Sequence, residues 1–234
     1  SSSIDTNIAL FDGLHDGAKI SNLKLDVSFK GVHSYSGALA GYSNGNVTLD
    51  SISVIGDIDD CHEVCGGLIG INQPTNGTLT ITNCNLDVDI TADGTHIGGI
   101  IGASHSNTII KDSKIGGDIS GKTSVGGVIG SSIQASYEIA NLSNIDSHFA
   151  ISGTTSVGGI FGNFSAPNFK VEKISLQHTV TSADNEIKII SGEESIGGVF
   201  GDLNISNMTA DSYLKDVHIK CPVTGSENVG GLIG

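Results

Sequence analysis

Apolar and polar residues alternate in short runs along most of this 234-residue chain. The clearest runs are TLTIT at 78–82, LDVDI at 86–90, TIIKDSKI at 108–115 and FKVEKISL at 169–176. A period of two with many β-branched residues predicts β-strands. Turns rich in Asn, Gly, Ser and Asp separate the runs, and no window has the 3.6-residue period of an amphipathic helix. The pattern therefore predicts an all-β protein.

A five-residue motif, GGxxG, divides these strands into repeats. Full copies begin at residues 66, 98, 126, 158, 197 and 230, GALAG at 37–41 is a weaker first copy, and LFDG at 10–13 is a divergent one. From residue 37 the steps between copies are 29, 32, 28, 32, 39 and 33 residues. Repeats of this length made only of strands cannot each enclose a core, so they become stable by stacking on one another.

The repeat predicts a parallel β-solenoid of about seven coils, each 28–39 residues long with roughly three short strands. Residues 1–36 are expected to form a divergent N-terminal coil, and residues 37–234 six GGxxG-bounded coils. Because GGLIG at 230–234 has no capping segment after it, we expect the coils to continue into a longer protein or to pack end to end in a filament.

The motif glycines are predicted to be structural, because adjacent glycines permit a positive φ or a close backbone approach at a tight corner. They are Gly66, Gly67, Gly70, Gly98, Gly99, Gly102, Gly126, Gly127, Gly130, Gly158, Gly159, Gly162, Gly197, Gly198, Gly201, Gly230, Gly231 and Gly234. The third and fourth motif positions form two apolar rows. We expect the row with Leu68 and Ile100 to face the interior, and the row with Ile69 and Ile101 to be covered by a neighbouring loop or partner.

Composition narrows the range of partners. The formal net charge is −14 and all 11 basic residues are Lys, so the clustered cations that neutralise nucleic-acid phosphates are missing. No apolar run approaches the roughly 18 residues that span a bilayer. We therefore expect neither a nucleic-acid partner nor membrane insertion.

The motifs VGGVIG, VGGIFG and VGGLIG, together with TLTITNCNLDVDI, resemble the GLUG-motif repeats of microbial surface proteins. That family includes the β-helical segments beside IgA1-specific metallopeptidases. The resemblance covers residues 10–234 and implies an extracellular or cell-surface location. No metallopeptidase zinc motif accompanies it, because HDGAK and HEVCG both lack the second His of H-E-x-x-H.

One stretch, DIDDCHEVCGGLIG at 57–70, concentrates chemically versatile residues. A solvated turn accounts for it, and a Cys61–Cys65 disulfide closing that turn is a sharper alternative. Two metal hypotheses stay open. Zinc would use both cysteines, His62 and a carboxylate, whereas calcium would use Asp57, Asp59 and Asp60. No other cofactor is expected.

Two further features bear on function. Sequons for N-glycosylation occur at Asn46, Asn76, Asn141, Asn163, Asn204 and Asn207. The eight His fall at differing repeat positions and Arg is absent, so no acid–base set for a polysaccharide lyase or hydrolase follows from spacing.

We therefore expect a non-catalytic structural or adhesive module: a stalk, a spacer or a filament. The alternative is an adhesin that binds a glycan or a host protein through the 39-residue coil from Gly158 to Gly197. A polysaccharide-active enzyme is the remaining alternative.

Overall fold

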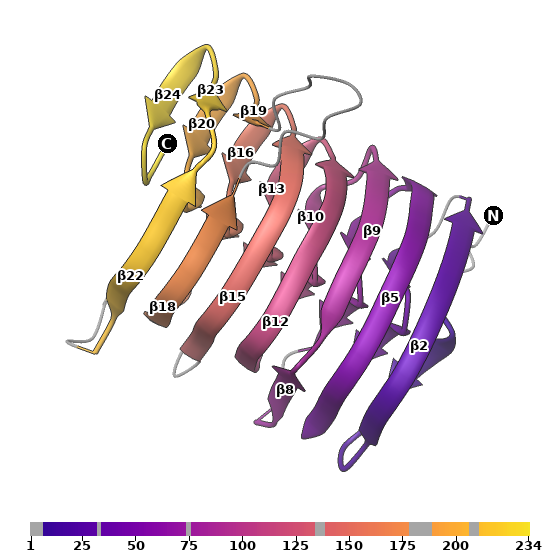
Figure 1. Cartoon of the computed structure of the whole chain (residues 1–234). Coiled ribbons are helices and arrows are strands. Elements are labelled where there is room, and N and C mark those ends of the chain that lie inside the picture. Colours follow the sequence, from indigo (N-terminus) through magenta and orange to yellow (C-terminus); the bar gives the residue numbers. More distant parts are fainter. Residues whose placement is uncertain (1–6, 32–33, 74–75, 134–138, 178–188, 206–210) are drawn as a thin grey trace.

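The computed structural model describes residues 7–31, 34–73, 76–133, 139–177, 189–205 and 211–234. Within these residues every regular element is a β-strand, and the chain winds into a parallel β-solenoid of about six turns (Figure 1). The predicted fold class is confirmed. The coils advance steadily from the N-terminal end to the C-terminal end, so each coil lies beside its neighbours in sequence.

Three sheets run along the solenoid, and every strand pair in them is parallel. Sheet A contains β3 (Tyr35–Gly37), β6 (Val64–Gly66), β10 (His96–Gly98), β13 (Thr123–Gly126), β16 (Thr155–Gly158), β20 (Glu194–Gly197) and β24 (Glu227–Gly230). Sheet B contains β1 (Phe11–Leu14), β4 (Ala40–Ser43), β7 (Ile69–Asn72), β11 (Ile101–Ser104), β14 (Ile129–Ser132), β17 (Phe161–Phe164) and β21 (Phe200–Leu203).

Sheet C contains the long strands that cross the front of Figure 1. In chain order, the strands of this sheet are β2 (Lys19–Lys30), β5 (Val47–Cys61), β8 (Thr78–Thr82), β9 (Asn85–Ala92), β12 (Asn107–Ser120), β15 (Ile139–Ser152), β18 (Asn168–Gln177), β19 (Ile190–Ser191), β22 (Tyr213–Lys220) and β23 (Val223–Thr224). The four alternating runs seen in the sequence all lie in these strands. Each coil contributes to all three sheets, as the prediction of roughly three strands per coil requires, but the strands of sheet C are longer than expected, since β5 alone has 15 residues.

At one position in each coil of sheet C a residue with positive φ turns the chain, within a long strand in most coils and between β8 and β9 at Asn83. These residues have φ between 50° and 60° and stack in register: Asn22, Ser51, Asn83, Asp112, Asn144, Lys173 and Asp216. Asn, Asp and Ser tolerate this left-handed conformation better than most residues because their short polar side chains bond locally. Sheet C is therefore bent along a single line.

The motif glycines let sheets A and B approach closely. A Cβ on Gly66 would lie 2.7 Å from the backbone nitrogen of Gly102, and the same relation recurs from Gly98 to Gly130 at 2.6 Å. Thus the first glycine of one motif packs on the last glycine of the next. None of the eighteen motif glycines, all of which are described, has a positive φ. Of the two predicted reasons for glycine, close approach is the one that applies.

The interior is mainly aliphatic, with several Phe in the later coils, and it includes both apolar rows of the motif in the inner coils. Leu68 and Ile100 are fully buried as predicted, but Ile69 and Ile101 are fully buried in the same core. The prediction that the second row needs a covering loop or partner is therefore wrong. The third motif position lies in the turn and the fourth opens the sheet B strand, so strict in-and-out alternation does not hold across the turn.

Candidate functional site

The stretch Asp57–Cys65 is divided between the inside and the outside of the solenoid. It runs from the end of β5 into β6. Cys61 and Cys65 are buried in the core, whereas Asp60 and His62 are exposed and Asp57 and Asp59 are half-buried. Strand alternation together with a register shift between Asp59 and Cys61 produces this division, because the shift leaves Asp59 and Asp60 both outside and Cys61 inside. The predicted zinc ligands are thus separated by the wall of the sheet.

On the outer side, the predicted metal ligands contact other residues. The Ser28 hydroxyl donates to the Asp57 carboxylate at 2.8 Å. Asp60 takes a left-handed φ of 59° and lies 3.7 Å from the Lys30 ammonium. Among the residues that the structure describes, no three His, Cys, Asp or Glu side chains are grouped so as to hold a metal ion. The calcium and zinc hypotheses remain predictions.

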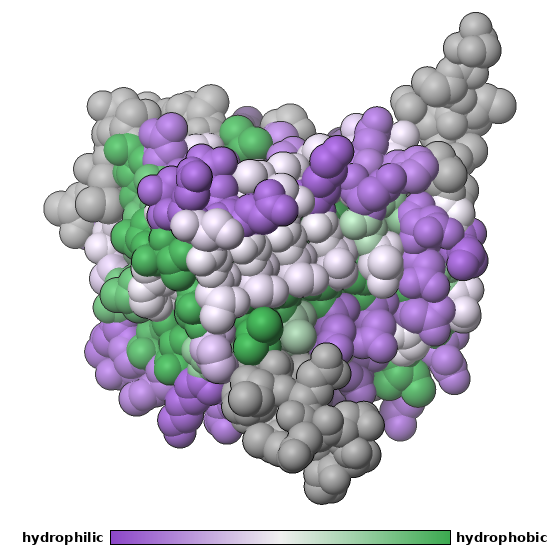
Figure 2. All heavy atoms as spheres, turned by 90° about the horizontal axis from the view of Figure 1, so that it is seen from above, coloured by the Kyte–Doolittle hydropathy of each residue, from purple (hydrophilic) through white to green (hydrophobic). Residues whose placement is uncertain are grey.

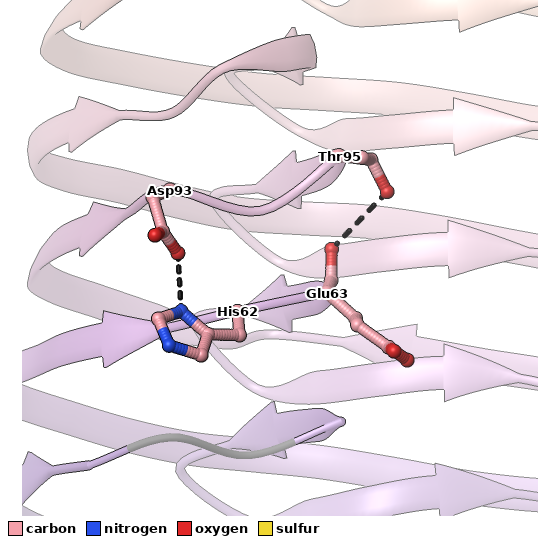
Figure 3. A network of polar contacts seen from close by, with 4 residues as sticks. All are labelled: His62, Glu63, Asp93 and Thr95. Atoms are coloured by element: carbon pink, nitrogen blue, oxygen red, sulfur yellow. Dashed lines mark hydrogen bonds and ion pairs between the residues drawn. The ribbon is translucent and has the colours of Figure 1, made fainter.

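His62 pairs with a residue of the next coil. Its Nδ1 contacts the Asp93 carboxylate, and both side chains lie on the outer surface (Figure 3). Beside them the Glu63 carbonyl accepts hydrogen bonds from the Thr95 and His96 amides at 2.8 and 3.2 Å. The Thr95 hydroxyl also donates to this carbonyl, as Figure 3 shows. The turn between β5 and β6 is therefore bonded to the next coil at two points, His62 and the Glu63 carbonyl.

On the inner side, the two thiols lie together with Ser36. A hydrogen bond to Cys65 is the largest cause that lowers the pKa of Cys61, and bonds to the Ser36 side chain and the Glu63 backbone act in the same direction against burial. The same thiol–thiol bond and burial raise the pKa of Cys65. Both residues are free thiols in this structure, and the predicted disulfide remains a prediction.

The other two cysteines are set apart from this pair. Burial raises the pKa of Cys84 to about 11, and its thiol donates to the Thr82 carbonyl at 3.3 Å. Burial also raises the pKa of Cys221. Both behave as small packed side chains rather than as nucleophiles.

A groove of about 440 Å³ lies on the outer face of sheet C, over β9, β12 and β15. Gly116 and Gly117 line it together with the polar side chains Asp87, Asp89, Asp118, Lys114 and His148. Parallel pairing brings these positions together from successive coils, since Asp87 is in register with Gly116 and Gly116 with His148. Alternation in each strand predicts which residues face outward, but not that the missing side chains at 116 and 117 leave a groove.

The sequons occupy two kinds of position. Asn46, Asn76 and Asn204 are exposed in turns, whereas Asn141 and Asn163 are half-buried in strands. The Asn46 amide donates to Asp16 at 3.0 Å and the Asn163 amide to Asp202 at 3.4 Å. Asn207 lies outside the described residues. The binding loop predicted within the 39-residue coil also falls partly outside them, at 178–188.

Several relevant residues are absent from the sequence-based predictions. Asp93 and Ser36 come from the neighbouring coils, so no sequence pattern around residues 57–65 points to them.

A sequence signature longer than GGxxG was also missed. The pattern [ST]-G-x-x-[SN]-[VI]-G-G recurs at 120–127, 152–159, 191–198 and 224–231. Its fifth residue has φ between 50° and 58°, as at Ser124 and Asn228, so this column of Ser and Asn marks a second bend.

In comparisons with known proteins, no family model, curated protein or solved structure matches this chain. The part of the chain that the structure describes has no helix of the length and hydropathy that a membrane span requires.

Proposed function

We propose that this chain is a non-catalytic structural module of an extracellular or cell-surface protein, serving as a stiff stalk, a spacer or a segment of a filament. The observation that supports the proposal is the hydrogen bonding of its polar side chains. Many of them bond the equivalent region of the next coil, about one repeat away in sequence, and so hold coil to coil.

Asp50 is the clearest example. Its carboxylate accepts bonds from the Thr82 hydroxyl at 2.8 Å and the Asn83 amide at 2.7 Å, both in the next coil, and these bonds lower its pKa. Asn144 donates to Asp112 in the same way at 2.6 Å. Each such bond adds to the continuous parallel backbone ladders, which gives a rod built from nearest-neighbour contacts.

The resemblance to GLUG-motif repeats supports the extracellular location. An acidic surface is compatible with it, since the charge of −14 keeps the chain soluble and apart from other anionic surfaces. Exposed sequons at Asn46 and Asn76 would be accessible to a glycosylation enzyme if the protein is secreted in a cell that has one.

The test is thermal unfolding of the chain with and without Ca²⁺ and a panel of neutral, acidic and amino-sugar oligosaccharides. A structural module should melt at one temperature throughout, because a ligand that binds the folded state raises the melting temperature with concentration. A saturable shift with any of these ligands would reject the purely structural role. Release of reducing ends from a polysaccharide would instead show an enzyme.

A glycan-binding adhesin is the second candidate, and the sheet C groove is the observation that favours it. Asp87, Asp89 and Asp118 place carboxylates around an open groove, and carboxylates accept hydrogen bonds from sugar hydroxyls. Their charge favours neutral sugars or amino sugars over uronates. Asp87→Ala and Asp89→Ala should abolish any saturable shift found above, while the exposed Ser120→Ala on the same sheet should preserve it.

A further inference from the structure

A buried polar cluster lies in the interior where the chain passes from sheet B to sheet C. Its centre is Asn72, the last residue of β7, which is fully buried. The Asn72 side-chain oxygen accepts a hydrogen bond from the Ser43 hydroxyl of the preceding coil at 3.0 Å. Its amide nitrogen donates to the Thr108 hydroxyl of the following coil at 3.2 Å and lies 3.5 Å from the Ser104 hydroxyl. Asn72 therefore links three successive coils through the core.

The part of the cluster in the following coil is bonded within itself. The Ser104 and Thr108 hydroxyls lie 2.7 Å apart, and each is within hydrogen-bonding distance of the Ser106 carbonyl oxygen, at 3.2 and 3.0 Å. All three residues are buried. Because a polar group without a partner is unfavourable in an apolar interior, each member of the cluster depends on the presence of the others.

The space at these positions does not itself require polar side chains. Two coils later in the parallel register, Ser104 is replaced by Phe164 and Thr108 by Phe169. The two rings meet edge-on with their centroids 5.5 Å apart. The same pair of positions therefore holds a hydrogen-bonded polar pair in one coil and an aromatic pair in another.

Other parts of the repeat differ much less from coil to coil. The sequence TSVGG, for example, occurs at 123–127 and again at 155–159. Chains built of similar repeats are prone to misassembly, in which repeats pair wrongly or are exchanged between copies. A buried feature that differs between coils opposes such errors, because it is satisfied only when the correct coils are neighbours.

We propose that the Asn72 cluster, consisting of Ser43, Asn72, Ser104 and Thr108, is an ordering lock that fixes which coil stacks on which as the chain folds. If the coil with the aromatic pair stacked on the Asn72 coil instead, the buried amide would face two rings and lose its acceptors. The wrong order is then disfavoured in the same way as a buried Asn fixes the register of a coiled coil. The lock acts in the assembly of the fold, so it is independent of whether the chain serves as a stalk or as an adhesin.

The test measures how faithfully the chain refolds. Chains with and without a heavy-isotope label are mixed, unfolded in urea and refolded together at low ionic strength, where the charge of −14 opposes contact between folded copies. Native mass spectrometry then counts dimers of mixed mass, which form when copies exchange coils. The wild-type chain should return to monomers. Several-fold more mixed dimers should form from an apolar variant that carries Ser43→Ala, Asn72→Leu, Ser104→Ala and Thr108→Val.

Two single substitutions make the result specific. Asn72→Ser fits the fold, because Ser43 and Ser104 occupy the same column, but it is too short to bond both neighbouring coils and should give an intermediate number of mixed dimers. Ser147→Ala removes a fully buried hydroxyl outside the cluster and should refold as the wild type does. Circular dichroism checks that each variant is folded.

Wild-type fidelity in the Asn72→Ser chain would overturn the proposal, and so would an equal rise in mixed dimers for Ser147→Ala. If the apolar variant does not refold at all, the comparison of these two single variants decides the question alone.

Discussion

At the scale of single residues, the second motif glycine is tightly constrained by the backbone of the next coil. A Cβ on Gly67 would lie 2.2 Å from the Gly99 carbonyl oxygen, and a Cβ on Gly99 would lie 2.2 Å from the Gly127 carbonyl oxygen. The column continues in this way through the solenoid. Because the obstructing atoms are backbone, no side-chain rotation relieves the contact. Glycine is required here by the spacing between coils.

The substitution Gly99→Ala should therefore destabilise the chain by about 1–3 kcal/mol, as overpacking does elsewhere. Gly231→Ala is the matched control, because it occupies the same column in the last coil and a Cβ there would meet nothing within 4 Å. Urea unfolding followed by circular dichroism measures both. Equal midpoints for the two variants would show that the coils can move apart to accept a methyl group.

His96 and His105 give a second prediction at this scale. Burial lowers the pKa of both, and the nearby charge of His105 lowers that of His96 further. Protons therefore bind the unfolded chain more readily, so stability is greatest above the unfolded pKa of about 6.5 and falls as the pH drops through and below it. Urea unfolding between about pH 7.5 and pH 5.5 should show this loss. In His96→Gln with His105→Gln the loss should be smaller, and an unchanged slope would refute the assignment.

The sequence revealed some of these residue roles and not others. It identified all eighteen motif glycines, because they recur at fixed offsets, but not which of two physical reasons applied to them. It found Cys61, Cys65 and His62 together, but it did not show that the two cysteines lie inside the solenoid and His62 outside. Their separation depends on the strand direction at a corner, and the partners Ser36 and Asp93 depend on coil spacing. Neither is local in sequence.

At the scale of elements, each sheet behaves as a set of columns whose members lie one coil apart. One sheet B column contains Phe11, Ala40, Ile69, Ile101, Ile129, Phe161 and Phe200. The rings of Phe161 and Phe200 stack with centroids 5.2 Å apart, and Phe164 meets Phe161 edge-on at 4.8 Å. Aromatic residues thus fill this column at Phe161 and Phe200, where the preceding inner coils have Ala or Ile.

Phe161→Ala should cost about 3–5 kcal/mol, because it leaves a cavity among packed rings. Phe11→Ala changes the same column at the first coil, where the ring is 42% exposed, and should cost less than half as much. The measurement is the urea midpoint of each variant at equal protein concentration. If both variants lose similar stability, the first coil is packed as tightly as the sixth, and the cost of removing a ring does not depend on its position in the column.

Strands could be predicted well because period-two alternation is a strong signal when one face is buried. The bends inside the long strands could not, since a single residue at positive φ leaves the alternation on either side intact. Ser51 and Asp112 occupy such bends within otherwise regular runs. Only the comparison of coils in register shows that Asn, Asp and Ser recur there, with Lys173 as an exception.

At the scale of the whole molecule, the two ends of the solenoid differ from its middle. In the last coil Val229, Leu232 and Ile233 are 45%, 51% and 46% exposed, whereas their counterparts in the inner coils are buried. Figure 2 shows apolar side chains gathered at this end. At the other end, β1 pairs with β4 alone among the described strands, and Phe11 belongs to the column that Ile233 continues through its bridge to Phe200. The first coil of a second copy could therefore continue the ladder.

We therefore predict that copies of this chain associate end to end, and that the ionic strength controls this association because the copies are charged. Each copy carries −14, so copies repel at low ionic strength, while at about 1 M salt the Debye length is near 3 Å and the apolar ends can meet. Sedimentation velocity should show larger species as salt and protein concentration rise. Leu232→Asp with Ile233→Asp should suppress them, since both substitutions place charge at the exposed end. Ser120→Asp adds charge on the exposed face of β12 instead and should leave association intact. Equal suppression by both variants would mean that the copies associate through their sides, and the filament proposal would then fail.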